Sequence, residues 1–257
     1  MAPWNPFPHP GAYAFDMASV AKNWARLHRG DCEPLPGNVE VLTAWVLFHN
    51  GEFQKAAETG LKAGGAGITV ASKATCIYAN YLENREKTRI DLFLEAAQRA
   101  EAQQAADPKN PNAWYWQAYA LGRYGQGISV AKALAQGLGN KIKAALGQTI
   151  QLAPQHADAH IALAAFHAEV IDKVGPLIGG MTYGVRKDTG LALFQTALKL
   201  NPGSAIAMTE YANGLVMLEG DKRMKEATGL YEQAAAAEAF DAMERLDVDM
   251  ARVELQD

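Results

Sequence analysis

The sequence has little of what marks several common functional classes. Its 257 residues include only two cysteines, Cys32 and Cys76, which lie far apart and show no metal-ligand spacing. We therefore expect free thiols in a reducing compartment rather than a disulfide framework or a zinc site. No apolar run reaches the roughly 18 residues that predict a transmembrane helix. The formal net charge of -4 disfavours a general nucleic-acid or anionic-membrane surface.

The first residues also lack the marks of a targeting segment. MAPWNPFPHPGAYAF has no basic start and no apolar core of the length found in signal peptides. From this we expect a cytoplasmic protein, or a periplasmic one if a leader is removed from the chain.

Catalytic motifs are missing as well. GRYGQGISVAK has the glycines of a phosphate loop but follows no predicted strand and lacks the Lys-Ser/Thr pair. There is no Gly-x-Ser-x-Gly nucleophile elbow. We therefore expect neither an enzyme nor a cofactor.

Three histidines, His156, His160 and His167, are spaced so that they could share one helix face. Their segment reads HADAH, without the glutamate of a zinc-protease HExxH helix. We favour structural roles for all three histidines, and leave open a metal site that zinc titration would detect.

What the sequence has in abundance is alanine and helical hairpins. The stretch from Asn110 to Pro154 predicts a helix, a Gly-rich turn at Gly122–Gly127 and a second, unusually long helix. Such a hairpin cannot bury its apolar face alone, so it requires neighbours of the same kind. The clearest predicted hairpins span 38–64, 110–153, 154–201 and 204–238, and a polar capping helix spans 241–255.

Small residues recur at fixed offsets within these hairpins. Around the turn at Gly51 they are Ala44, Ala56 and Ala63, and Gly190, Phe194, Ala197 and Pro202 follow a related pattern. This spacing resembles the tetratricopeptide repeat, a helix–turn–helix unit of about 34 residues. The resemblance implies an all-α, right-handed superhelix (a solenoid) of about twelve helices, which we expect to form one domain over residues 17–257.

The chain departs from the standard repeat in two places. The second helix of the third hairpin is too long, and a Gly-rich insertion at 171–188 separates the two helices of the fourth, where we expect a flexible connector. Residues 110–235, with ALGRYGQ, QLAP and LKLNPG, resemble the domain shared by regulators of microtubule dynamics and the T-component associated with TRAP transporters. That resemblance implies no catalytic residues.

Residues 1–16 form a different kind of segment, with four prolines and the aromatic residues Trp4, Phe7, Tyr13 and Phe15. Proline disfavours a helix here and predicts an extended arm. Because exposed aromatic side chains are costly in water, we expect the arm to pack along the helices. Binding of a partner or a membrane is the alternative.

The family resemblance implies that the first helix of each hairpin lines an inner groove. In that register the candidate partner-binding residues are Trp45, Phe48, Tyr115, Tyr119, Arg123, Ile161, Thr209 and Asn213, with Val41 and Ala165 beside them. The chaperone-binding members of the family clamp a C-terminal carboxylate with Lys and Asn. Only Asn213 matches that set, which disfavours an acidic C-terminal peptide.

These observations predict a non-catalytic scaffold that binds a protein segment in its concave groove. The alternative is a carrier or sensor of a small apolar ligand or lipid, held between the long helices and the 171–188 insertion. A further interpretation is that the aromatic groove residues are simply buried by the arm or the extra helix length. Homo-oligomerisation is left open.

Overall fold

The computed structural model describes residues 3–255, apart from the side chains of Val130, Ala131 and Leu134. All regular structure in this range is helical. The chain forms two compact units. Unit 1 comprises Met1–His28, Glu33–Leu152 and Asp241–Met243, and unit 2 comprises Arg29–Cys32, Ala153–Phe240 and Glu244–Asp257. The division after Leu152 falls within one residue of the predicted boundary between two hairpins.

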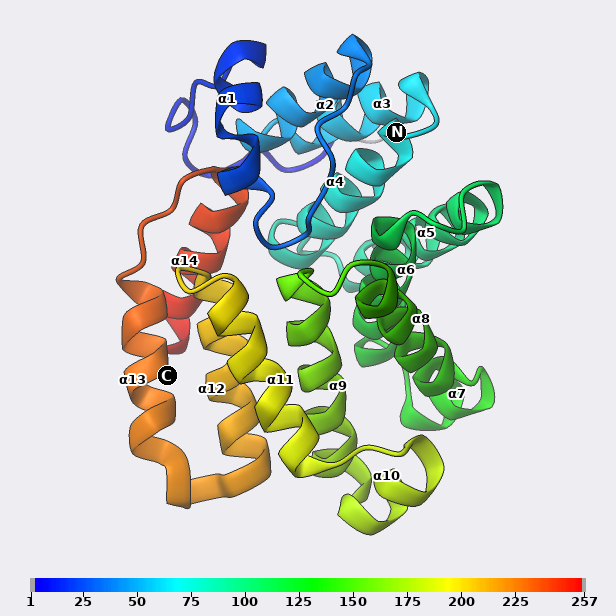
Figure 1. Ribbon diagram of the computed structural model, residues 1–257, viewed down its shortest axis with the longest axis vertical. Coiled ribbons are helices and arrows are strands. Elements are labelled where there is room, and N and C mark those ends of the chain that lie inside the picture. The colour runs from blue at the N-terminus through cyan, green and yellow to red at the C-terminus, as the bar shows by residue number, and fades with distance from the viewer. Residues whose placement is uncertain (1–2, 256–257) are drawn as a thin grey trace. The chain divides into compact units, whose positions relative to one another are not determined.

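Unit 1 is a series of helices in which most pack against their neighbours in sequence (Figure 1). They are α1 (Met17–Leu27), α2 (Val39–His49), α3 (Phe53–Ala63), α4 (Gly67–Tyr81), α5 (Glu86–Ala106), α6 (Pro111–Gln126), α7 (Val130–Ala135) and α8 (Leu138–Leu152).

Unit 2 is built in the same way, with α9, α11, α12 and α13 side by side in Figure 1. Its elements are α9 (Ala157–Val174), α10 (Pro176–Tyr183), α11 (Lys187–Leu200), α12 (Ala205–Glu219), the 3-10 turn η1 (Gly220–Arg223), α13 (Met224–Ala235) and most of α14 (Ala242–Glu254).

Side-chain caps mark where the hairpins begin. Asn38, Asn110, His156 and Ser204 each accept a hydrogen bond from a main-chain amide in the first turn of α2, α6, α9 and α12. Each cap satisfies an amide that would otherwise lack a partner inside its helix. These four helices are the first helices of the four predicted hairpins, so local sequence determines their starting points.

The predicted turn at Gly122–Gly127 is wrong. Helix α6 continues through Gly122 and Gly125 and ends at Gln126, with Gly127 as its C-cap. A Cβ atom on Gly127 would lie 2.8 Å from Ile90 Cγ1, so this glycine allows the end of α6 to approach α5 closely. The longer helix places Arg123 in its last turn.

Two other predicted segments also differ from expectation. The long second helix of the third hairpin is interrupted at Gly137, whose φ of +64° is a left-handed conformation, so α7 and α8 are separate helices. The predicted connector at 171–188 contains the short helix α10. Gly179 allows α10 to pack closely, because a Cβ there would lie 2.8 Å from Val185 Cγ2.

The core of unit 1 contains an unusual number of aromatic rings and histidines. Trp24 stacks on His28 with ring centroids 4.0 Å apart, and Trp45 stacks on His49. His49 Nδ1 lies 2.6 Å from Asp241 Oδ2, and its Nε2 lies 3.3 Å from His28 Nε2. All of these side chains are buried. Hydrogen bonds among His28, His49 and Asp241 make the burial of these three side chains tolerable.

The core of unit 2 follows a small-against-large pattern. Phe194 stacks on Tyr211 with ring centroids 5.2 Å apart, and Ala164 and Ala212 pack in the same cluster. A Cβ on Gly214 would lie 2.3 Å from Phe194 Cε2, so the ring occupies the space that this glycine leaves. The small residues let neighbouring helices approach, as the repeat pattern predicts.

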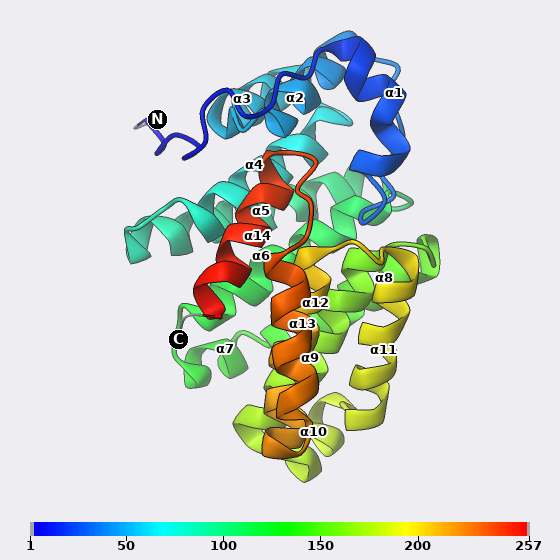
Figure 2. The same cartoon turned by 90° about the vertical axis from the view of Figure 1, so that its left-hand side faces the viewer.

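The N-terminal arm, residues 3–15, lies over α2 and α3 and reaches the end of α4, as expected (Figure 2). The indole ring of Trp4 in the arm stacks on the Tyr78 ring, with ring centroids 4.2 Å apart. Phe7 is buried and meets Phe53 edge to face. None of the helices between residues 3 and 255 combines the length and apolar character that crossing a membrane requires.

A buried carboxylate fixes the turn between α4 and α5. Glu83 accepts hydrogen bonds from the Arg85 guanidinium, from the Arg85 amide and from the Tyr78 hydroxyl. The Arg85 hydrogen bonds lower the pKa of Glu83 from 4.5 to about 2. This turn sets where α5 begins.

Replacing Glu83 tests the role of this turn, because the stability that Glu83 contributes should depend on pH. We expect Glu83→Gln to lower the free energy of unfolding by about 2 kcal/mol at neutral pH, since hydrogen bonds to a charged group are lost. A depressed carboxyl pKa stabilises the fold above pH 4.5 and loses that effect as the pH falls toward 2. Denaturant titrations at several pH values should therefore show the gap between wild type and variant closing over this range.

The matched control for that measurement is Glu95→Gln. Glu95 is half-exposed and pairs with Arg99 one helical turn away, so its loss should cost much less. A constant difference between wild type and Glu83→Gln at all pH values would contradict the assignment.

Candidate functional site

The groove residues predicted in unit 1 are mostly core residues. Trp45 and Phe48 are completely buried, and Tyr115 is nearly so. The Lys73 ammonium group on α4 lies 5.5 Å from the centre of the Trp45 ring and 5.1 Å from that of Phe48, and Trp24, His28 and Phe53 also pack against these rings. These rings therefore lie in the core of unit 1, and the side chains that cover them belong to neighbouring helices rather than to the arm or the extra helix length. Tyr119 and Arg123 remain partly exposed.

The predicted groove residues of unit 2 follow the same trend. Ile161 belongs to the core cluster around Phe194, and Thr209 is completely buried. Asn213 is half-buried, and its side-chain oxygen accepts a hydrogen bond from the Tyr231 hydroxyl. Ile161 and Thr209 are therefore core residues of unit 2.

The three histidines have separate main-chain partners. His156 Nδ1 accepts a hydrogen bond from the Ala159 amide, and His160 Nε2 lies 3.1 Å from the Pro154 carbonyl oxygen. His167 Nδ1 accepts a hydrogen bond from the Arg186 amide. These contacts match the structural roles that we favoured. Across residues 3–255 no group of three His, Cys, Asp or Glu side chains is placed to hold a metal ion.

Neither cysteine is poised for nucleophilic chemistry. Both thiols are free. Burial, with the nearby carboxylates of Asp31 and Asp158, raises the pKa of Cys32 to about 11, and burial raises the pKa of Cys76 further. Because the thiolate is the reactive form, the raised pKa values disfavour nucleophilic chemistry at either thiol.

A polar cavity lies where the ends of α4, α5 and α6 meet in unit 1. We call it the arginine pocket; its lining residues are Asn80, Glu86, Arg89, Ile90, Phe93, Arg123, Gln126 and Gly127. Its volume is about 230 Å³. That is smaller than the roughly 300–1,000 Å³ of a site enclosing a drug-sized ligand. The pocket therefore suits one side chain or a small acid.

Helical spacing brings the lining residues together. Glu86, Arg89, Ile90 and Phe93 fall at intervals of three, four and seven residues, which places them on one face of α5. Arg123 and Gln126 share the last turn of α6, and Asn80 lies in the last turn of α4. Phe93 is buried and forms an apolar base to the pocket.

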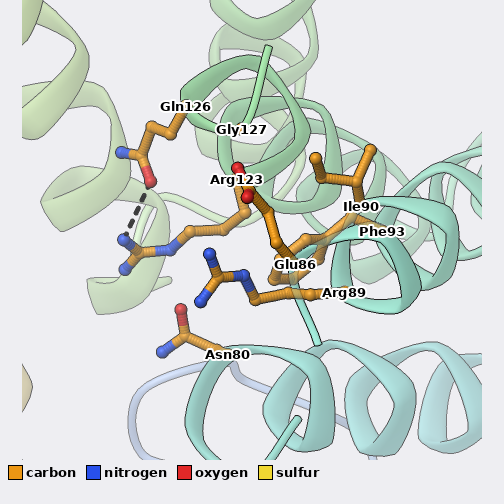
Figure 3. Close-up of a pocket in the computed structure, with 8 residues that line it drawn as sticks. All are labelled: Asn80, Glu86, Arg89, Ile90, Phe93, Arg123, Gln126 and Gly127. Carbon is orange, nitrogen blue, oxygen red and sulfur yellow. Dashed lines mark hydrogen bonds between the residues drawn. The ribbon is translucent and has the colours of Figure 1, made fainter. Parts of the chain in front are cut away.

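Figure 3 shows the guanidinium groups of Arg89 and Arg123 extending in the same direction, with the Asn80 amide near Arg89. Arg123 donates a hydrogen bond to Gln126 Oε1 and lies over the Tyr119 ring, 5.4 Å from its centre. The side chains of Arg89, Asn80 and Glu86 make no hydrogen bond or ion pair with any other residue between 3 and 255.

The electrostatics of the arginine pocket favour an anion. The lining contains two guanidinium groups and one carboxylate, that of Glu86, so it has an excess of positive charge. A guanidinium presents its N–H donors in a planar fork that matches a carboxylate. The Arg89 guanidinium and the Asn80 amide beside it are donors that no other residue between 3 and 255 uses.

Sequence reasoning found only part of this site. Arg123 was predicted from the family register, and Tyr119 lies next to it. Arg89, Asn80 and Glu86 were missed, since they lie outside the first-helix positions that the family uses. The signal in the sequence was the position of Arg89 directly before Ile90 and Phe93, two apolar residues three positions apart on a face of α5 that we would expect to contact another helix.

Comparison with known proteins identifies the fold. No family model matches the chain, and no curated protein matches it. Among solved structures it is similar to the crystal structure of a thermophilic TPR protein from Thermus thermophilus, with a TM-score of 0.58 and 14% sequence identity over 83% of this chain and 97% of that chain. The chain has a tetratricopeptide-like, all-α solenoid fold. At this identity the likeness concerns the fold alone.

The burial of Trp45 leads to a stability prediction. We expect Trp45→Ala to lower the free energy of unfolding by about 3–5 kcal/mol, because it leaves a cavity in the core. Tyr119→Ala should lower the free energy of unfolding clearly less, because the Tyr119 ring is only half-buried. Chemical denaturation followed by circular dichroism measures both changes. Equal, small effects would show that Trp45 is not the core residue described here.

Proposed function

We propose that this protein is a non-catalytic adaptor that holds a segment of a partner protein, and that the arginine pocket anchors an acidic group of that segment. The observation that carries the proposal is the Arg89 guanidinium, which lines the cavity beside Arg123 without a partner among the described residues. The tetratricopeptide-like fold supports it, because solenoids of this kind typically bind proteins and are typically non-catalytic.

An acidic group fits the pocket better than an apolar one. The sequence disfavoured an acidic C-terminal peptide, because among the first-helix positions only Asn213 matches the Lys and Asn residues of the family. The donors here come instead from the ends of α4, α5 and α6. A carboxylate between Arg89 and Arg123 would gain charge-assisted hydrogen bonds, while Ile90 and Phe93 would contact the aliphatic part of the same side chain.

The finer resemblances add context to this proposal. Likeness to regulators of microtubule dynamics and to the T-component associated with TRAP transporters remains a prediction from residues 110–235. It is compatible with an adaptor, and it is also compatible with the carrier that we consider second.

Variants of the pocket test the adaptor function. Affinity purification of the tagged full chain from its own cells, followed by quantitative mass spectrometry, gives the proteins it retains. We expect Arg89→Ala combined with Arg123→Ala to reduce recovery of a retained partner at least about tenfold, equivalent to about 1.4 kcal/mol of binding free energy. Arg89→Lys should be intermediate, since it keeps the charge but loses the planar fork.

Lys87→Ala is the matched control. Lys87 is an exposed cation on the same turn of α5 and does not line the pocket. It should leave the recovered proteins unchanged. Identical recovery by wild type, pocket variants and control, with all variants folded, would contradict the proposal.

A carrier of an apolar ligand or lipid is the second candidate, with one observation in its favour. Helix α10, within the 171–188 insertion, exposes Leu177, Ile178 and Met181. Exposed apolar clusters of this kind often mark binding surfaces. Native mass spectrometry of the purified protein, before and after denaturation, should show a released small molecule if the carrier function holds, and the bare protein mass if it does not.

A further inference from the structure

The N-terminal arm contacts unit 1 in the way that a peptide ligand contacts a receptor. The surface beneath it, which we call the arm-binding face, consists of Asn50, Gly51, Phe53, Gln54, Tyr78 and Leu82. These residues come from the end of α2, the start of α3 and the end of α4 with the residue that caps it. No residue of 3–15 belongs to a helix.

Side chains of the arm-binding face recognise the main chain of the arm. The Trp4 amide donates to Gln54 Oε1 at 2.9 Å, and the Asn5 amide donates to the Tyr78 hydroxyl at 3.3 Å. At the other end Asn50 forms two hydrogen bonds with Phe15, accepting from its amide and donating to its carbonyl oxygen. Contacts to main-chain groups hold an extended peptide whatever its exact sequence.

Two aromatic residues of the arm supply the sequence-dependent part of its recognition by the arm-binding face. Trp4 stacks on Tyr78, and Phe7 is the one arm residue between 3 and 15 that is buried. Phe7 lies over Gly51, where a Cβ atom would be only 2.6 Å from the Phe7 ring. The glycine therefore leaves the space that the phenyl ring occupies. Anchors at Trp4 and Phe7 explain why the residues between them can remain exposed.

The composition of the arm makes it suitable for exchange. Pro3, Pro6, Pro8 and Pro10 restrict the free chain, so little conformational entropy is lost on binding. Most arm residues are exposed on their outer side, and the arm can leave without unwinding any helix. A packed core segment would lack both properties.

We propose that the arm-binding face is a recognition surface for an extended, Pro-rich peptide with two aromatic residues three positions apart. The chain's own arm occupies it in cis, and a peptide of the same chemistry from a partner replaces the arm in trans. This surface is distinct from the arginine pocket, so the proposal does not depend on the proposed adaptor function.

The test adds a fluorescently labelled synthetic peptide of residues 3–16 to the full-length protein and follows fluorescence anisotropy. The receptor is either wild type or Trp4→Ala/Phe7→Ala, in which the cis arm has lost its anchors. A tethered arm competes at an effective concentration of about millimolar. We therefore expect the peptide to bind the double variant at least about tenfold more tightly than wild type.

Two glycine variants in the double-variant background make the test specific. Gly51→Ala fills the space of the Phe7 ring and should abolish peptide binding. Gly64→Ala is the matched control, because Gly64 also has a positive φ, +65°, but a Cβ there meets nothing within 4 Å. It should bind the peptide like its parent. A labelled peptide with Trp4 and Phe7 replaced by alanine should not bind at all.

The proposal is overturned if the peptide fails to bind the double variant while limited proteolysis shows its arm to be released. Equal affinity for wild type and double variant also overturns it, since the cis arm would then not be the competitor. Should the double variant fold poorly, Trp4→Ala alone replaces it. Trp4 is only partly buried, so its loss weakens one anchor and leaves the core intact.

Discussion

One lysine buried among aromatic rings links three helices of unit 1. The Lys73 side chain on α4 is almost completely buried, with its ammonium group 5.1–5.9 Å from the ring centres of Phe48, Trp45 and Trp116. A buried cation is costly unless favourable electrostatics replace its hydration. The faces of aromatic rings supply part of that replacement. Helices α2, α4 and α6 are thereby tied to one another through a single side chain.

This arrangement also explains where binding can occur. The rings that a tetratricopeptide register would present to a partner are used to surround Lys73, so that stretch of the expected groove is closed. Polar groups without internal partners gather instead where α4, α5 and α6 meet. Arg89, Asn80 and Glu86 lie there with Arg123, whose guanidinium is held over Tyr119. The packing of these helices therefore buries the rings around Lys73 and leaves the arginine pocket accessible at their ends.

The fold was largely predictable, and the candidate site was not, for physical reasons. Caps such as Asn38 and Ser204 and the small-residue spacing act locally, so they are visible in the sequence. That Gly122 and Gly125 are helical was not visible, because tertiary context can override the turn propensity of glycine. Nor was the burial of Trp45, whose ring meets Trp24 and His28 of another helix and lies near a lysine 28 positions away. Register identified Arg123, but Arg89 becomes a neighbour only through the packing of α5 against α6.

The arm-binding face and the arginine pocket share one short segment of chain. Tyr78 supports Trp4 on the arm side, and two residues later Asn80 lines the pocket. The Tyr78 hydroxyl also donates to Glu83, which holds Arg85 directly before Glu86 of the pocket. A hydrogen-bonded path thus runs from the arm to the start of α5. Contiguity alone does not establish coupling, which requires an element with two alternative arrangements. The arm provides that element if it exchanges, since Tyr78 would then lose both the Trp4 ring and the Asn5 amide next to the Glu83 turn.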